Sequence, residues 1–124
     1  MKEYILLFTT LVFLSTSAIA IAEKKSMGPE VKTVSGTIID NRCADANKDK
    51  LGSFIKTHTK ECALMPPCAA SGYSLYDNGS LLRFDGPSSK KIEKFLSEKN
   101  SRLNVTLSVR KEGNRYSLVS IKNS

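Results

Sequence analysis

The 124-residue chain has no tryptophan, one histidine and three cysteines, and several common catalytic patterns are missing from it. It has no glycine-rich phosphate loop, so the usual nucleotide-binding signature is excluded. No serine lies in a nucleophile-elbow context, and C-x-x-C-H, the common motif for covalent haem attachment, does not occur. We therefore predict no catalytic residues. An activated thiol at Cys43 would be the only obvious nucleophile of an enzyme.

Acidic residues are the scarcer charge: 12 Asp and Glu stand against 19 Lys and Arg, which gives a net charge of +7. A basic surface can favour nucleic acid, anionic lipid or acidic glycans. Here the basic residues form no single block, and the four tyrosines are not interleaved with them as in a stacking platform. Nucleic acid is therefore not a predicted partner, although the charge is compatible with an anionic cell envelope.

Long apolar runs are absent except near the start. Lys2 gives a weak positive beginning, residues 5–14 are mostly apolar, and small residues lead to possible cleavage sites after Ala20 and Ala22. This is the layout of a secretory signal peptide, and the run is too short for a permanent span, which needs about 20 residues. We predict a periplasmic or secreted protein with no membrane span in its mature chain. The predicted organisation is a signal peptide (1–22), a flexible lead-in (23–31) and one domain (32–124).

The remaining pattern predicts a mainly β domain. Alternating or β-branched segments indicate five strands, and an amphipathic helix begins at Ser88 or Ser89 and runs to about Lys99. The Asn78-Gly79 pair predicts a tight hairpin turn, and Gly36 suggests a bulge or bend in the first strand. The predicted strands are 32–40, 73–76, 81–84, 103–109 and 116–121, the last with a bulge at 118–119. Five strands with a helix between the third and fourth match an OB-like barrel; the runner-up is an open α+β sheet.

A polar insert between the first two predicted strands holds every cysteine and the only histidine: Cys43, His58, Cys62 and Cys68. Thiolates and imidazole suit Zn²⁺, copper or haem iron. If residues 57–62 are helical, His58 and Cys62 share one face and could share a metal. Asp40 could orient a ligand from outside the coordination sphere, and Met65 offers a thioether suited to copper.

A disulfide is the alternative interpretation of the same residues. Any two of Cys43, Cys62 and Cys68 could pair and leave one thiol over. A bond from Cys43 to either of the others closes a loop of about 20–25 residues, which stabilises by roughly 3 kcal/mol in the loop-entropy model. Such a bond would staple the polar loop at 40–50, which has little apolar surface of its own.

The central residues resemble a family of small exported bacterial proteins. The shared pattern runs from Asp40-x-x-Cys43, through His58-Thr59-x-x-Cys62-Ala63-Leu64-Met65-x-x-Cys68, to Ser71-Gly72-Tyr73, and the resemblance covers nearly the whole mature chain. It implies export and an OB-like fold, and it implies that the four Cys and His residues form one unit. It implies no activity, because the family is largely uncharacterised.

Two functions follow as hypotheses. The first is an exported binding module whose Cys/His cluster holds zinc, copper or haem. The second is a disulfide-stapled interaction domain without a metal, which binds an envelope protein, a peptide or a glycan.

Overall fold

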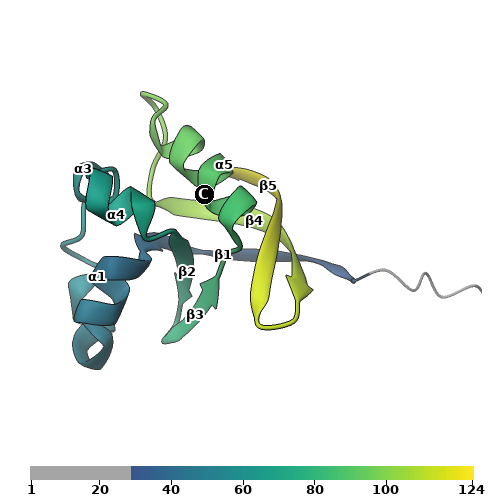
Figure 1. The fold of residues 1–124 in the computed structure, drawn as a ribbon, viewed down its shortest axis with the longest axis horizontal. Coiled ribbons are helices and arrows are strands. Elements are labelled where there is room, and N and C mark those ends of the chain that lie inside the picture. Colours follow the sequence, from purple (N-terminus) through teal and green to yellow (C-terminus); the bar gives the residue numbers. More distant parts are fainter. Residues whose placement is uncertain (1–28) are drawn as a thin grey trace, which may run out of the picture.

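The computed structural model describes residues 29–124, which form a five-stranded antiparallel sheet with helices at one end and across one face (Figure 1). The predicted signal peptide lies outside the described residues. In spatial order the strands are β3 (Ser80–Arg83), β2 (Tyr73–Asp77), β1 (Val31–Asp40), β4 (Asn104–Glu112) and β5 (Arg115–Asn123). Within these residues, no helix is long and apolar enough to cross a membrane.

The prediction of a mainly β domain with five strands is confirmed, whereas a closed barrel is not. Ladders join each neighbouring pair of strands from β3 to β5. Between the two outer strands, the described residues show only one parallel bridge, from Phe84 to Tyr116. The sheet is therefore open, and its two outer edges, at β3 and β5, lie close to each other at this bridge.

Helix α5 (Gly86–Leu96) lies between β3 and β4 in the chain, as predicted, but begins earlier than expected. Asp85 is its N-cap and accepts a hydrogen bond from Ser88 N at 2.8 Å. The two serines are buried in the first turn instead. Ser88 Oγ accepts from Leu118 N, and Ser89 Oγ accepts from Tyr73 N, so both serines tie the helix to strands.

The two predicted strand irregularities have different outcomes. The β4–β5 register shifts by one residue, so that Val109 faces Leu118 while Ser108 faces Ser120, and a bulge at Val119 is confirmed. Of the bulge or bend predicted at Gly36, the bulge is absent, because β1 pairs with β4 without interruption there. A Cβ at Gly36 would lie 2.3 Å from the Tyr76 carbonyl oxygen, so the position needs glycine for close packing.

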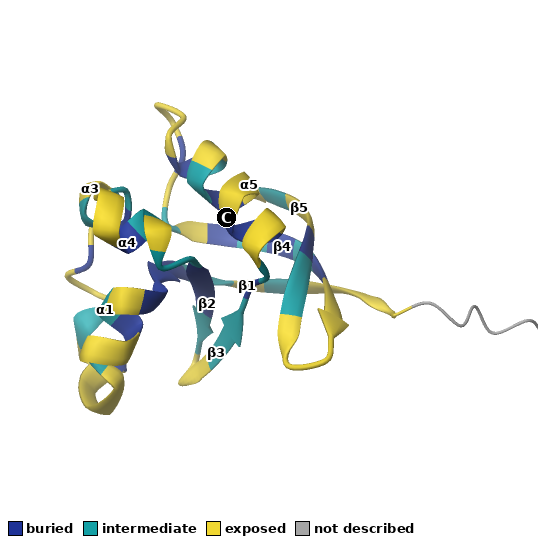
Figure 2. Cartoon of the chain, viewed as in Figure 1, coloured by how far each residue is buried: buried dark blue, intermediate teal, exposed yellow. Residues whose placement is uncertain are grey.

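The main core lies between the sheet and α5, and both elements have buried stretches (Figure 2). Its residues include Ile38, Leu75, Ile92 and Leu107. Ile39, the next residue of β1, faces the other way, since side chains alternate along a strand. It packs in a second, smaller cluster with Ala44 and Leu51. The insert is thus fixed to the sheet by its own apolar contacts at the end of β1.

The insert contains more helix than the sequence predicted. It consists of α1 (Asn41–Ala46), a 3₁₀ turn (Lys48–Lys50), α2 (Leu51–Phe54), α3 (Lys60–Ala63) and α4 (Pro66–Ala70). Pro66 and Pro67 are the first two residues of α4. Proline is tolerated in the first helical turn because its missing N–H would have no helical partner there.

Gly36→Ala should destabilise the domain by about 2 kcal/mol or more, because backbone must move to admit the new Cβ. Gly86→Ala is the matched control, since a Cβ there meets nothing within 4 Å, and it should change the unfolding free energy by less than about 0.5 kcal/mol. Urea unfolding followed by circular dichroism measures both. Equal effects from the two substitutions would contradict the close approach of Tyr76.

Candidate metal centre

Asp40 is the fully buried last residue of β1 and the origin of the site. Its Oδ1 accepts a hydrogen bond of 2.8 Å from Cys43 N, which caps the first turn of α1. Aspartate is among the preferred N-cap residues because its carboxylate satisfies an N–H group that lacks a helical partner. The same carboxylate therefore ends the strand and starts the helix that presents Cys43.

All three cysteines occupy the third position of a short helix. Cys43 follows the cap Asp40 in α1, Cys62 follows the cap Thr59 in α3, and Cys68 follows Met65 in α4. The Thr59 side chain accepts from Cys62 N at 3.2 Å, which repeats the Asp40 arrangement. In the Asp40 and Thr59 motifs the spacing x-x-Cys is thus a capping pattern, in which the cap side chain bonds the cysteine N–H, whereas Met65 makes no side-chain cap bond.

His58 lies in the link between α2 and α3, so the helix expected at 57–62 is present only from Lys60. Its Nε2 is 2.9 Å from Asp40 Oδ2, and both side chains are inaccessible to solvent. The ring of Phe54 is tilted by 44° against the imidazole, with centroids 5.5 Å apart. The Nδ1 atom is buried and has no hydrogen-bond partner within residues 29–124.

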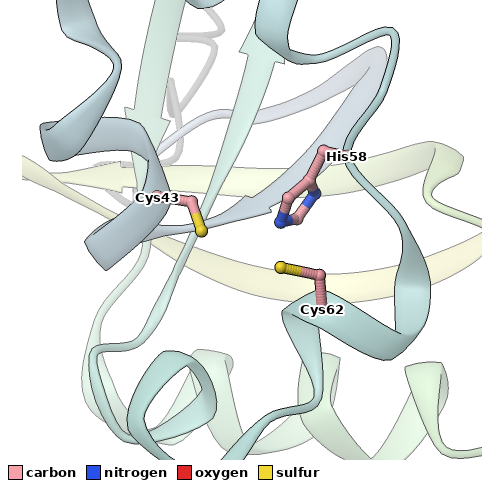
Figure 3. Close-up of side chains that lie close together, drawn as sticks. All are labelled: Cys43, His58 and Cys62. Atoms are coloured by element: carbon pink, nitrogen blue, oxygen red, sulfur yellow. The ribbon is translucent and has the colours of Figure 1, made fainter.

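The structure brings three of the four predicted ligands into one set. The sulfurs of Cys43 and Cys62 and a ring nitrogen of His58 all lie within 4.8 Å of one another. The three side chains point toward a common space, although they come from α1, the α2–α3 link and α3 (Figure 3). Cys43 and Cys62 are 19 positions apart in the sequence, and the fold of the insert brings them together.

Cys68 belongs to a second, overlapping set rather than to the first. Its sulfur, the Cys43 sulfur and an Asp40 oxygen lie within 4.8 Å of one another. Cys68 is buried, whereas the other two cysteines are partly exposed. Met65 is 53 % exposed and contributes through its backbone oxygen, which accepts from Cys68 N. The four predicted ligands therefore meet as two triads that share Cys43.

The predicted disulfide is not formed, since all three cysteines are free thiols. Hydrogen bonds hold the insert in its place. Tyr73 Oη donates to the Ala63 carbonyl of α3 at 2.8 Å, and Asn41 Nδ2 donates to Ser71 O at 2.9 Å. The polar loop therefore does not need a sulfur staple to be ordered, contrary to the sequence argument.

The buried carboxylate shifts the protonation of its surroundings. Burial acts to raise the pKa of Asp40, but hydrogen bonds from His58 and from Cys43 outweigh it and hold that pKa below its usual value. Burial raises the pKa of the Cys43 thiol, and the negative charge of Asp40 adds to the rise. Burial and then Asp40 likewise raise the pKa of Cys68. The environment of Cys43 thus opposes the activated thiolate that an enzyme would need there.

One side of His58 borders a pocket of about 460 Å³. Its basic lining residues are Lys56, Lys60 and Arg102. Lys60 Nζ is held by backbone oxygens after α5, including Ser101 O at 3.0 Å, while Lys56 and Arg102 are exposed. The histidine is therefore buried behind a basic opening.

Sequence reasoning missed the residue that joins the insert to β2. Asn41 Oδ1 accepts a 2.5 Å hydrogen bond from Ser74 Oγ of β2, and Asn41 N donates to Gly72 O. The signal available was weak: an asparagine directly after a predicted strand is usually a turn residue.

Comparisons of the chain with known protein families, with curated proteins and with solved structures gave no match.

Asp40→Asn should lower stability in a pH-dependent way. The pKa of Asp40 is lower folded than unfolded, so its carboxylate stabilises the fold above the unfolded value of about 3.9, and this contribution is lost as pH falls through the folded value. The difference in unfolding free energy between the parent protein and the variant should therefore be largest above about pH 5 and shrink below about pH 4.

Urea unfolding at a series of pH values measures this difference. Asp45→Asn is the control, because Asp45 is exposed and its ion pair with Arg83 is of a kind that contributes little. A constant difference for Asp40→Asn across the acid range would show that the buried pair does not set the acid stability.

Proposed function

We propose that this domain is a small metal-binding module that holds one Zn²⁺ or Cu⁺ ion through Cys43, His58 and Cys62. The observation that carries the proposal is the mutual distance of the three ligand atoms, all within 4.8 Å. Two thiolates and one imidazole are the donors that these ions prefer. Asp40 Oδ2 lies 2.9 Å from His58 Nε2 and holds the imidazole ring beside the two sulfurs.

The distances suit an ion more than they suit haem. Tetrahedral zinc with sulfur at about 2.3 Å and nitrogen at about 2.0 Å separates its ligands by roughly 3.5 Å, which the cluster can reach by small side-chain rotations. Haem iron takes at most two axial protein ligands and needs no such convergence of three. Three protein ligands also leave a fourth position for an external ligand.

We further infer an OB-like arrangement and export. The strand order β3-β2-β1-β4-β5 and the Phe84–Tyr116 bridge at the open side support the first. The composition of residues 1–22 supports a signal peptide and a periplasmic or secreted protein. The family resemblance of the Cys/His motif supports both.

The alternative function, a disulfide-stapled interaction domain, depends on a disulfide, and all three cysteines are free thiols. We therefore favour metal binding over binding of an envelope protein, a peptide or a glycan.

The reduced protein should bind one zinc ion per chain in equilibrium dialysis followed by metal analysis. Cys62→Ser should weaken binding at least tenfold, because it removes a thiolate ligand from a partly exposed position. Cys68→Ser is the matched control, since Cys68 lies outside the triad with His58, and it should keep the stoichiometry. Equal loss in both variants, or no zinc in the parent protein, would reject this ligand set.

Zinc binding should release protons and strengthen as pH rises from about 6 to about 8. The raised pKa of Cys43 keeps it a neutral thiol in the metal-free protein at these pH values, so the ion must displace its proton. The apparent affinity should then rise about tenfold per pH unit for each proton released. Calorimetry in two buffers of different ionisation enthalpy counts the protons, and a count of zero would contradict thiol ligation.

A further inference from the structure

Cys43 belongs to both triads. Its sulfur lies within 4.8 Å of the Cys62 sulfur and within 4.8 Å of the Cys68 sulfur. A disulfide has a sulfur–sulfur length of about 2.05 Å, so side-chain rotation, with movement of the short helices where it is needed, has a gap of less than about 3 Å to close. The insert is thus built so that one thiol has two candidate partners.

Exposure distinguishes the two partners. Cys43 and Cys62 are both partly exposed, whereas Cys68 is buried. Thiol–disulfide exchange with a dissolved reagent requires the reagent to reach a sulfur, so access favours the Cys43–Cys62 pair. These two residues are also the two thiolates of the proposed metal site.

We propose that Cys43 and Cys62 form a reversible disulfide by exchange with a low-molecular-weight disulfide, and that this bond and the metal exclude each other. The second clause rests on the proposed metal function, because the bond consumes both sulfur ligands. The pair is therefore an oxidisable dithiol that holds a metal only in its reduced form.

The reaction balances without any further reactant. The thiolate of one cysteine attacks a sulfur of the external disulfide, forms a mixed disulfide and expels one external thiolate. The second cysteine then attacks the protein sulfur of that mixed disulfide and expels the other. The two protons lost by the cysteines end on the two released thiols, the protein pair is oxidised by two electrons, and the external disulfide is reduced.

A bound metal should block the first step. A thiolate that is coordinated to Zn²⁺ shares its lone pair with the ion and is no longer free to attack. In the opposite direction, the disulfide leaves only the imidazole of His58 in the first triad, which is too few ligands for a stable site.

The test uses the full chain, reduced and metal-free, with oxidised glutathione as the external disulfide. Intact mass, peptide mapping and thiol counting follow the products. We expect one intramolecular bond between Cys43 and Cys62, with Cys68 remaining as the single free thiol. Loading with Zn²⁺ beforehand should slow the reaction at least tenfold, and the oxidised protein should bind no zinc.

Cys68→Ser is the control, and it should form the same bond and keep no free thiol. Cys62→Ser should lose the bond. A Cys43–Cys68 bond in the parent protein, or mixed disulfides only, would overturn the pairing. Oxidation that proceeds at the same rate in zinc-saturated protein would overturn the mutual exclusion.

The metal-free arm keeps the two proposals distinguishable. A Cys43–Cys62 bond in a protein that binds no zinc would reject the metal function and uphold the redox pair. Zinc binding at unit stoichiometry without the bond would do the reverse.

Discussion

One buried carboxylate organises the insert. Asp40 closes β1, caps α1 through Cys43 N with one oxygen, and bonds His58 Nε2 with the other. A buried carboxylate is costly unless it is hydrogen-bonded, and both oxygens of Asp40 have hydrogen-bond partners. The strand end, the first ligand-bearing helix and the histidine are therefore positioned by a single group, and the two residues it contacts are both in the proposed ligand set.

The sheet could be predicted from sequence because its signals are local. Alternation along β4, the Asn78-Gly79 turn with positive φ at both residues, and the phase change at Val119 each follow from neighbouring residues. The insert could not be predicted in the same way. Helices of four to six residues have too few hydrogen bonds to be stable alone, so tertiary contacts decide where they form.

The cysteine motif could be predicted from the sequence only in part. The grouping of Cys43, His58 and Cys62 was predictable, because soft ligands concentrated in one insert suggest a common site. The way in which these residues meet was not predictable, since the helix expected across 57–62 begins only at Lys60. Capping by Asp40 and Thr59 performs that task instead. Closure of the barrel could not be predicted either, since it depends on whether two strands distant in sequence form a ladder.

The same burial that orders the cluster also opposes its ionisation. Hydrogen bonding to Asp40 fixes Cys43, and burial with the charge of Asp40 raises the pKa of that thiol. A raised pKa makes a poor nucleophile but is no obstacle to a divalent ion, whose charge offsets that of the carboxylate and the thiolates together. The electrostatics of the cluster therefore disfavour a free thiolate at Cys43 and favour one bound to a cation. This difference is the physical argument for a metal site over a catalytic thiol.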